Sequence, residues 1–162
     1  MVTSQSLKDK FDEKAASIEA AVAGLSDEQA SRRPAEDQWS ARDVLCHLAG
    51  DAESTFHDDL NRFLNEDKPH LGIAPGELYW NADREKLSLS DLAKSTADQY
   101  REIGKLVGDL TPEQLARPGR IAFLKQVRGT DEIAMSEWVS LMVDYHLNQH
   151  INQLQALAAT SA

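Results

Sequence analysis

Two histidines near the end of the chain, His146 and His150, have the spacing of a metal-binding pair. Residues four apart lie on the same face of a helix, so both imidazole rings can offer a nitrogen atom to one ion. The H-x-x-x-H pattern alone is a moderate signal, because two polar histidines on a helix surface have the same spacing. A metal site is therefore predicted only if another helix supplies a third ligand at the same height.

Three other histidines are candidates for that third ligand. His70 follows a proline in a segment without periodicity, and His57 precedes two aspartates that indicate a solvent-exposed position. His47 follows a predicted helix start and borders an apolar stripe. We therefore predict His47 as the third ligand, and the alternative is a histidine packed between helices.

Apolar residues three and four apart predict four long helices that position these histidines. They cover residues 7–25, 40–65, 90–110 and 130–157, with short helical turns beginning at Ser26 and Thr111. Residues 66–88 contain Pro69, Gly72 and Pro75 and predict a long connection. No segment alternates as a strand does, so we predict an all-α four-helix bundle in which residues 1–162 form one domain. A shift of 85 residues aligns the first helix and its following turn with the third, which suggests an internal repeat.

Helix geometry tests whether His47 can meet the pair. At 1.5 Å per residue, His146 and His150 lie about 24 and 30 Å from the start of the fourth helix, and His47 lies about 27 Å from the far end of the second. The three heights agree only if these two helices are antiparallel. The long connection permits this arrangement, because it could cross the bundle between helices 2 and 3 and give an up-down-down-up topology.

Composition limits the classes of function. The chain has 162 residues and a formal net charge of -10, which disfavours binding to nucleic acid and to anionic membranes. It has no predicted membrane span and begins without the apolar run of a signal peptide, so we predict a cytoplasmic protein. The single cysteine, Cys46, fits a reducing compartment and is predicted to be a buried apolar residue and not a nucleophile.

Three neutral imidazoles leave a divalent ion with an open position for water or substrate. Zinc and nickel both accept this donor set. Such an ion lowers the pKa of a bound water or thiol, which is chemistry that a hydrolase or a thiol transferase uses. Asp51, one turn after His47, is a weak candidate for a base, and the alternative is an ordinary solvated acid.

Two segments resemble a known family: residues 39–48, WSARDVLCHL, and H-x-x-x-H-x-x-Q-L from His146 to Leu154. The chain resembles the DinB-like superfamily, which includes the YfiT-like metal-dependent hydrolases, over nearly its whole length. This resemblance implies a four-helix bundle of up-down-down-up topology, a metal site made by His47, His146 and His150, and a homodimer.

The resemblance also implies several functions. Members include thiol-dependent transferases and isomerases that use bacillithiol, mycothiol or glutathione, and hydrolases of small molecules. We expect thiol-dependent S-transfer in detoxification, with metal-dependent hydrolysis and a non-catalytic dimeric, stress-associated binding protein as alternatives. An anionic thiol cosubstrate would need cations at the rim of the site, and the candidates are Arg42, Arg84, Arg101, Arg120 and Arg128.

Overall fold

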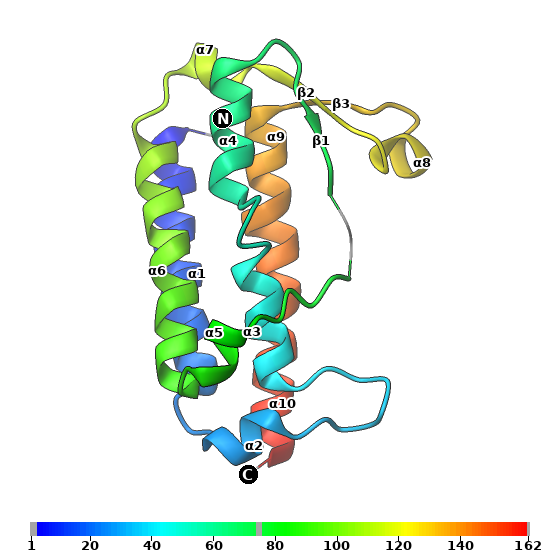
Figure 1. Cartoon of the computed structure of the whole chain (residues 1–162). Coiled ribbons are helices and arrows are strands. Elements are labelled where there is room, and N and C mark those ends of the chain that lie inside the picture. Colours follow the sequence, from blue (N-terminus) through cyan, green and yellow to red (C-terminus); the bar gives the residue numbers. More distant parts are fainter. Residues whose placement is uncertain (1–2, 74–75, 162) are drawn as a thin grey trace.

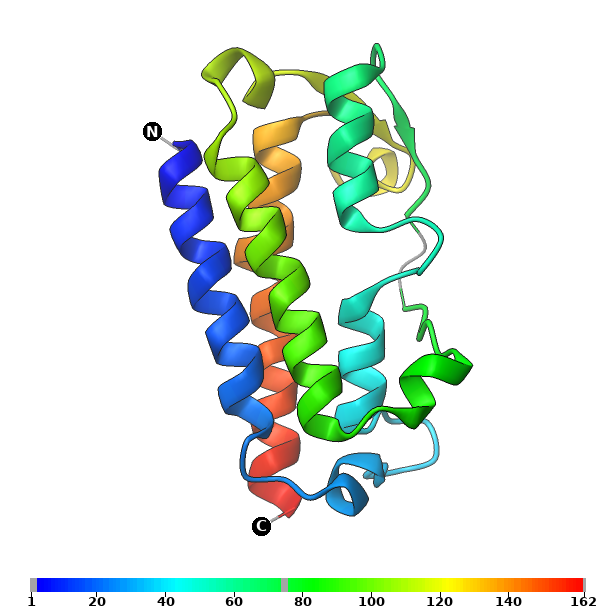
Figure 2. The same ribbon diagram turned by 60° about the vertical axis from the view of Figure 1, so that its left-hand side comes forward.

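The computed structural model describes residues 3–73 and 76–161, most of which are helical. The long helices form columns that lie side by side (Figures 1 and 2). They are α1 (Ser4–Val22), α3 (Ala41–Ala49) with α4 (Phe56–Asn65), α6 (Leu89–Gly108), and α9 (Met135–Ser140) with η1 (Leu141–His146) and α10 (Leu147–Ser161). The short helices are α2 (Asp27–Ser31), α5 (Ala82–Lys86), α7 (Pro112–Leu115) and α8 (Leu124–Arg128). The predominantly helical fold predicted from the sequence is confirmed.

Helices α1 and α6 form the regular part of the core. Leu7, Phe11 and Ile18 of α1 are fully buried against α6 residues that include Ile103. A side chain at Gly104 would place its Cβ 2.8 Å from the Cβ of Phe11, so the two helices approach closely only because this residue is glycine. The predicted repeat is visible in the boundaries, because α1 and α2 begin 85 residues before α6 and α7.

The second predicted helix is not continuous. Helix α3 ends at Ala49, and Gly50 has a φ of 72° and a ψ of -176°, a region that glycine adopts without strain. Thr55 then starts α4 with a capping box, in which its side chain accepts a hydrogen bond from the Asp58 amide. The prediction of one helix over residues 40–65 is therefore wrong, because a glycine and a new cap interrupt it.

The fourth predicted helix begins later than expected and contains an irregular segment. It starts at Met135 and not at residue 130, because Glu132–Ala134 forms a strand. Residues 141–146 then form a π-helical segment, η1, between α9 and α10. The heights calculated from residue 130 and from a continuous second helix thus do not apply as stated.

A small sheet covers one end of the bundle, where Figure 1 shows it beside α4 and α9. Its strands are β1 (His70–Leu71), β2 (Pro118–Ile121) and β3 (Glu132–Ala134) in the order β1-β2-β3. β1 and β2 are parallel with Leu71 opposite Ile121, and β2 and β3 are antiparallel with Gly119 opposite Ile133. The expectation of no strands is corrected, since strands this short leave no readable alternation in the sequence.

The opposite end of the bundle carries α2, α5 and the C-terminal part of α10 (Figure 1). Across the described residues, no helix combines the length and the apolar character needed to span a membrane.

Candidate metal centre

His47, His146 and His150 lie together in the bundle. Each offers a nitrogen atom, and the three atoms lie within 4.8 Å of one another. The Nε2 atoms of His47 and His146 are 2.9 Å apart. His47 comes from the last turn of α3, His146 ends η1, and His150 lies one turn later on α10. The structure thus brings the three predicted ligands to one point.

Hydrogen bonds set the orientation of two of these rings. His47 Nδ1 lies 2.5 Å from the backbone oxygen of Glu77, and a carbonyl oxygen only accepts, so Nδ1 carries the hydrogen and donates it. His150 Nδ1 lies 2.9 Å from Oε1 of Gln153 and donates in the same way. In the neutral form of each ring, Nε2 then keeps a free electron pair.

His146 is held without such a bond. Its Nδ1 atom is buried and has no hydrogen-bond partner among the residues that the structure describes. Burial, together with the nearby His150 and His47, lowers the pKa of His146 to about 3. Burial also lowers the pKa of His150, against the opposing effect of Gln153. Both rings are therefore neutral at physiological pH, which is the form that binds a metal ion.

This donor set fits a divalent cation. Three imidazoles present nitrogen atoms to one point, and two of them donate their other N-H group to a backbone or amide oxygen, as metal-ligating histidines commonly do. Without a shared cation or proton, electron pairs on Nε2 of His47 and His146 would repel at 2.9 Å. The residues present therefore match the requirements of an open three-nitrogen site.

Aromatic rings surround the three histidines. Trp39 stacks on His150 with ring centroids 5.9 Å apart, and it also lies 4.9 Å from His47. Tyr79 stacks on His47 at 6.2 Å and has a φ of 51°, a left-handed conformation that is uncommon outside glycine. His47 and His150 are accordingly only 9% and 7% exposed. The rings of Trp39 and Tyr79 thus shield the three histidine nitrogen atoms from much of the bulk water.

The other two histidines lie elsewhere. His57 lies on α4 with its Nδ1 atom 3.1 Å from the side chain of Asn61, and His70 is exposed in β1. Neither belongs to the cluster of the other three. Their separation from the cluster agrees with the sequence prediction.

Asp51 is placed differently from the prediction. It follows Gly50 outside α3, is exposed, and accepts a hydrogen bond from the Glu53 amide. It therefore does not lie one helical turn above His47, because the helix has already ended. Cys46 is fully buried, and burial raises the pKa of its thiol to about 11, as expected of an apolar core residue.

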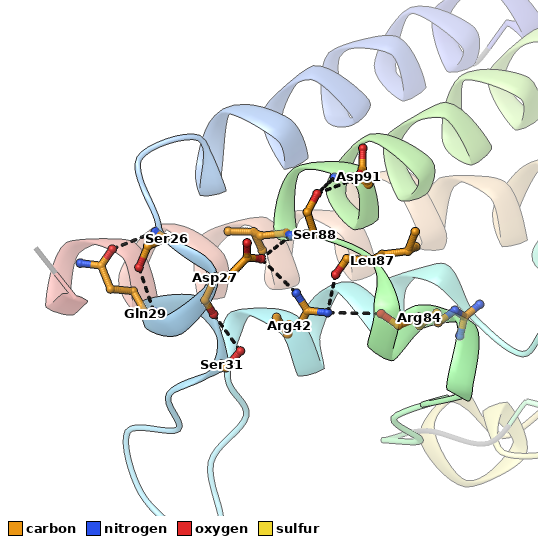
Figure 3. A network of polar contacts seen from close by, with 10 residues as sticks. Ser26, Asp27, Gln29, Ser31, Arg42, Arg84, Leu87, Ser88 and Asp91 are labelled. Carbon is orange, nitrogen blue, oxygen red and sulfur yellow. Dashed lines mark hydrogen bonds and ion pairs between the residues drawn. The ribbon is translucent and has the colours of Figure 1, made fainter.

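The five candidate rim arginines all contact other protein groups. Arg42 is 7% exposed and donates to Asp27 and to the carbonyl oxygens of Arg84 and Leu87 (Figure 3). Arg84 donates to the carbonyl oxygens of Tyr79, Cys46 and Ala49. The remaining three pair with acids: Arg101 with Glu19 and Asp98, Arg120 with Asp131 and Glu132, and Arg128 with Glu137. Each of the five guanidinium groups thus already has at least one partner within the protein, and the expectation of an anionic thiol stays a prediction.

Sequence reasoning missed the residues that tie the long connection to α3. The buried carboxylate of Asp43 accepts hydrogen bonds from Arg33 at 2.8 and 3.1 Å and from the Trp80 indole at 2.7 Å. Only its capping role beside Ser40 was readable, from the hydroxyl-x-x-acid spacing. Glu77 acts through its backbone oxygen, which leaves no signal in the residue type.

A surface cleft of about 720 Å³ lies between α2, α3 and α5. Its lining includes Arg33, Arg42, Asp43 and Trp80, and none of the three clustered histidines. The candidate metal centre is thus identified by its donor atoms and not by this cleft.

Comparison with known proteins identifies the family. A model of the DinB superfamily matches residues 10–154. Among solved structures, YfiT from Bacillus subtilis, described as a probable metal-dependent hydrolase with an unusual four-helix bundle topology, is similar with a TM-score of 0.77. The two sequences are 19% identical, and the match covers 99% of this chain and 90% of that one, so the likeness shows a shared four-helix bundle fold. No curated protein matches. The chain belongs to the DinB superfamily, as its sequence motifs indicated.

Proposed function

We propose that this member of the DinB superfamily is a metal-dependent enzyme that acts on a small molecule. His47, His146 and His150 would hold a divalent ion, zinc or nickel. The observation that carries this proposal is the convergence of three imidazole nitrogens within 4.8 Å, with two rings oriented by hydrogen bonds on their far side. A bound ion of this type supplies a Lewis acid that makes a nucleophile available at neutral pH.

The residues around the histidines have separate roles in this proposal. Glu77 and Gln153 hold His47 and His150 with Nδ1 protonated, so each ring offers Nε2. Trp39 and Tyr79 limit the access of water from the sides and leave an apolar, aromatic surface for a substrate. Asp51 stays a weak candidate for a base, since it is exposed and lies outside α3.

Hydrolysis is the reaction that the geometry favours. It needs no anionic cosubstrate, and all five candidate rim arginines already contact other protein groups. Thiol S-transfer in detoxification, with a low-molecular-weight thiol, is the second candidate and is favoured by the sequence resemblance alone.

The topology and the assembly are further parts of the proposal. An up-down-down-up bundle is supported by the meeting of His47 with His146 and by the colours of Figure 2, where α3, α4 and α6 run toward the sheet end and α1 and α10 run away from it. A homodimer is proposed from family membership.

Elemental analysis of protein purified without an affinity tag tests the metal. We expect about one zinc or nickel ion per chain. If no stoichiometric metal binds even after reconstitution, both enzymatic proposals fail, and the non-catalytic binding protein becomes the better reading.

A second experiment separates the two reactions. The cobalt-substituted protein is titrated with glutathione while the charge-transfer region of its spectrum is recorded, and hydrolysis of a neutral aryl ester is measured in parallel. Ester hydrolysis without a thiol-dependent band supports the hydrolase, whereas a saturable band supports thiol transfer.

A further inference from the structure

Arg84 connects the two segments that meet at His47. Its guanidinium donates to the carbonyl oxygen of Tyr79 at 2.6 Å and to those of Cys46 and Ala49 at 3.5 and 3.4 Å. Tyr79 belongs to the long connection, and Cys46 and Ala49 belong to the last turn of α3. One side chain thus holds the connection against the end of the helix that carries His47.

The end of α3 depends on this contact. The last four carbonyl groups of a helix have no partner inside the helix and need one elsewhere. Here the Gly50 amide donates to the carbonyl oxygen of His47, and the Tyr100 hydroxyl donates to that of Leu48. Arg84 donates to the other two carbonyl oxygens. Without Arg84, two carbonyl oxygens beside the histidine would lose their partner.

Arg84 is itself fixed by neighbouring groups. Its amide donates to the side chain of Asn81 at 2.9 Å, and its carbonyl oxygen accepts a hydrogen bond from Arg42, as Figure 3 shows. The adjacent Trp80 donates to the buried Asp43 of α3. The segment from Trp80 to Arg84 is therefore attached to α3 at several points, and the guanidinium has little freedom to move.

This attachment reaches His47 through Tyr79 and Glu77. The Tyr79 backbone has a φ of 51°, and such left-handed conformations persist where surrounding contacts stabilise them. Its carbonyl oxygen, held by Arg84, provides one of these contacts. The Tyr79 ring stacks on His47, and two residues earlier the Glu77 oxygen accepts the Nδ1 hydrogen of the same ring.

We propose that Arg84 is a positioning residue of the metal centre. By joining the Tyr79 carbonyl to the end of α3, it keeps the Glu77 oxygen on His47 Nδ1, which leaves Nε2 unprotonated and directed at His146 and His150. Its effect on metal binding rests on the function proposed above, whereas its effect on the His47 ring does not. This role differs from the anion-binding role that the sequence suggested for the same arginine.

The test uses Arg84→Met, which removes the donors and keeps most of the apolar stem. In the metal-free protein, long-range ¹⁵N–¹H spectra of the histidine rings report which nitrogen of His47 is protonated. We expect a single Nδ1-H form in the parent protein and a mixture of the two tautomers in the variant. In the parent protein reconstituted with zinc, we expect an affinity 10- to 100-fold higher than in the variant, the range found when outer-shell partners are removed.

The chain offers a matched control in Arg117. Its guanidinium donates to the carbonyl oxygens of Phe63 and Glu66 at 2.5 and 2.9 Å, at the end of α4. Arg117→Met removes the same kind of contact near the sheet. It should lower the thermal midpoint by a similar amount and change neither the His47 tautomer nor the zinc affinity by more than about twofold. Arg84→Lys, which keeps a charge and can reach one carbonyl, should recover part of the parent affinity.

The outcomes separate the two proposals. If folded Arg84→Met keeps the parent His47 spectrum and zinc affinity, the positioning role is wrong. If the parent protein binds no zinc, the proposed function fails, and the tautomer measurement on metal-free protein still decides the role of Arg84. If Arg84→Met does not fold, as judged by circular dichroism, Arg84→Gln is measured instead with the same two readouts.

Discussion

Helices α1 and α6 are regular over 19 and 20 residues, whereas the other two columns of the bundle are both interrupted. One breaks between α3 and α4 at residues 50–55, and the other contains the π-helical segment η1. All three clustered histidines lie on the interrupted columns, and none lies on the regular pair. The regular pair contributes to the hydrophobic core, and the interrupted, irregular pair of columns carries the candidate metal centre.

This difference has a physical basis. A regular amphipathic helix is stabilised by every residue of its buried stripe, so few positions are free to point polar atoms inward. Breaks and π-helical turns cost stability and are frequent at functional sites, where they redirect side chains. The break after α3 leaves backbone carbonyl oxygens without partners inside the helix, and Arg84 and Tyr100 donate hydrogen bonds to them. The π-helical segment η1 ends at the ligand candidate His146.

The largest expected effect is on the irregular pair. His146→Ala should lower metal affinity by at least 100-fold, because two imidazoles do not replace three, and helical content should stay near that of the parent. Elemental analysis and circular dichroism measure the two quantities. His57→Ala, on α4 outside the cluster, is the control and should bind metal normally. Unchanged metal content in His146→Ala would show that the ligand set is wrong.

A cavity in the regular pair should lower the stability of the protein and leave its metal affinity unchanged. Ile103 of α6 is fully buried, and Ile103→Ala should reduce the free energy of unfolding by about 2 to 5 kcal/mol. Chemical denaturation of the metal-free protein gives this value. Metal affinity, measured where the variant is folded, should change by less than about twofold. A large loss of affinity would remove the distinction between the two pairs of columns.

Asp43 lies on α3, in one of the two interrupted columns, and the effect of replacing it should depend on pH. Burial tends to raise the pKa of its carboxyl, but hydrogen bonds from Arg33, Ser40 and Trp80 outweigh burial and lower it. The folded state thus prefers the charged form, and this stabilisation is present above the unfolded pKa of about 4 and is lost as pH falls through the lower folded pKa.

Asp43→Asn should therefore cost about 1.5 to 3 kcal/mol of unfolding free energy at pH 7, the range for hydrogen bonds to a charged group. The difference from the parent should shrink below about pH 4 as the parent carboxyl becomes protonated. Denaturation at a series of pH values measures it. Glu102→Gln, at an exposed position of α6, is the control and should change the unfolding free energy at pH 7 by less than about 0.5 kcal/mol. A difference that stays constant down to pH 2 would contradict the assigned role.

The smallest expected effect on stability concerns the break between α3 and α4. Gly50 combines a φ of 72° with a ψ of -176°, a region essentially restricted to glycine, and open space surrounds it, so Gly50→Ala adds backbone strain without a clash and should cost about 1 to 3 kcal/mol. Gly24 also has open space but lies outside the positive-φ region, and Gly24→Ala should be neutral within about 0.5 kcal/mol. Equal effects at both positions would mean that the break does not require glycine.

The sequence predicted the residues of the site better than the elements that hold them. His146 and His150 were readable from helical spacing, and His47 from its place behind a helix cap. The break at Gly50 was missed because the apolar stripe continues through Phe56 and Leu60, although Thr55 and Asp58 carried the signal of a new cap. Periodicity reports which face is buried and is insensitive to a short interruption.

Two features had no accessible signal. The π-helical turn differs from an α-helical turn by one residue and has no residue preference that marks it in η1. The role of Arg84 depends on backbone oxygens of Tyr79, Cys46 and Ala49, and every residue type has such an oxygen. The sequence analysis therefore interpreted Arg84 by its charge, as a candidate for binding an anion. In the structure, its hydrogen bonds to backbone carbonyl groups determine its position.

The π-helical turn at η1 acts as a phase shift in an otherwise continuous helix. Because it accommodates an extra residue, the faces of α9 and α10 are set independently: Met135 and Val139 face the core beside the sheet, while His150 faces α3. Forcing the same six residues into α-helical geometry would turn one of these faces relative to the other by about 100°, whereas deleting one residue there would leave a regular α-helix with both faces as they are. A single inserted residue thus lets one helix serve a packing surface at one end and a ligand cluster at the other.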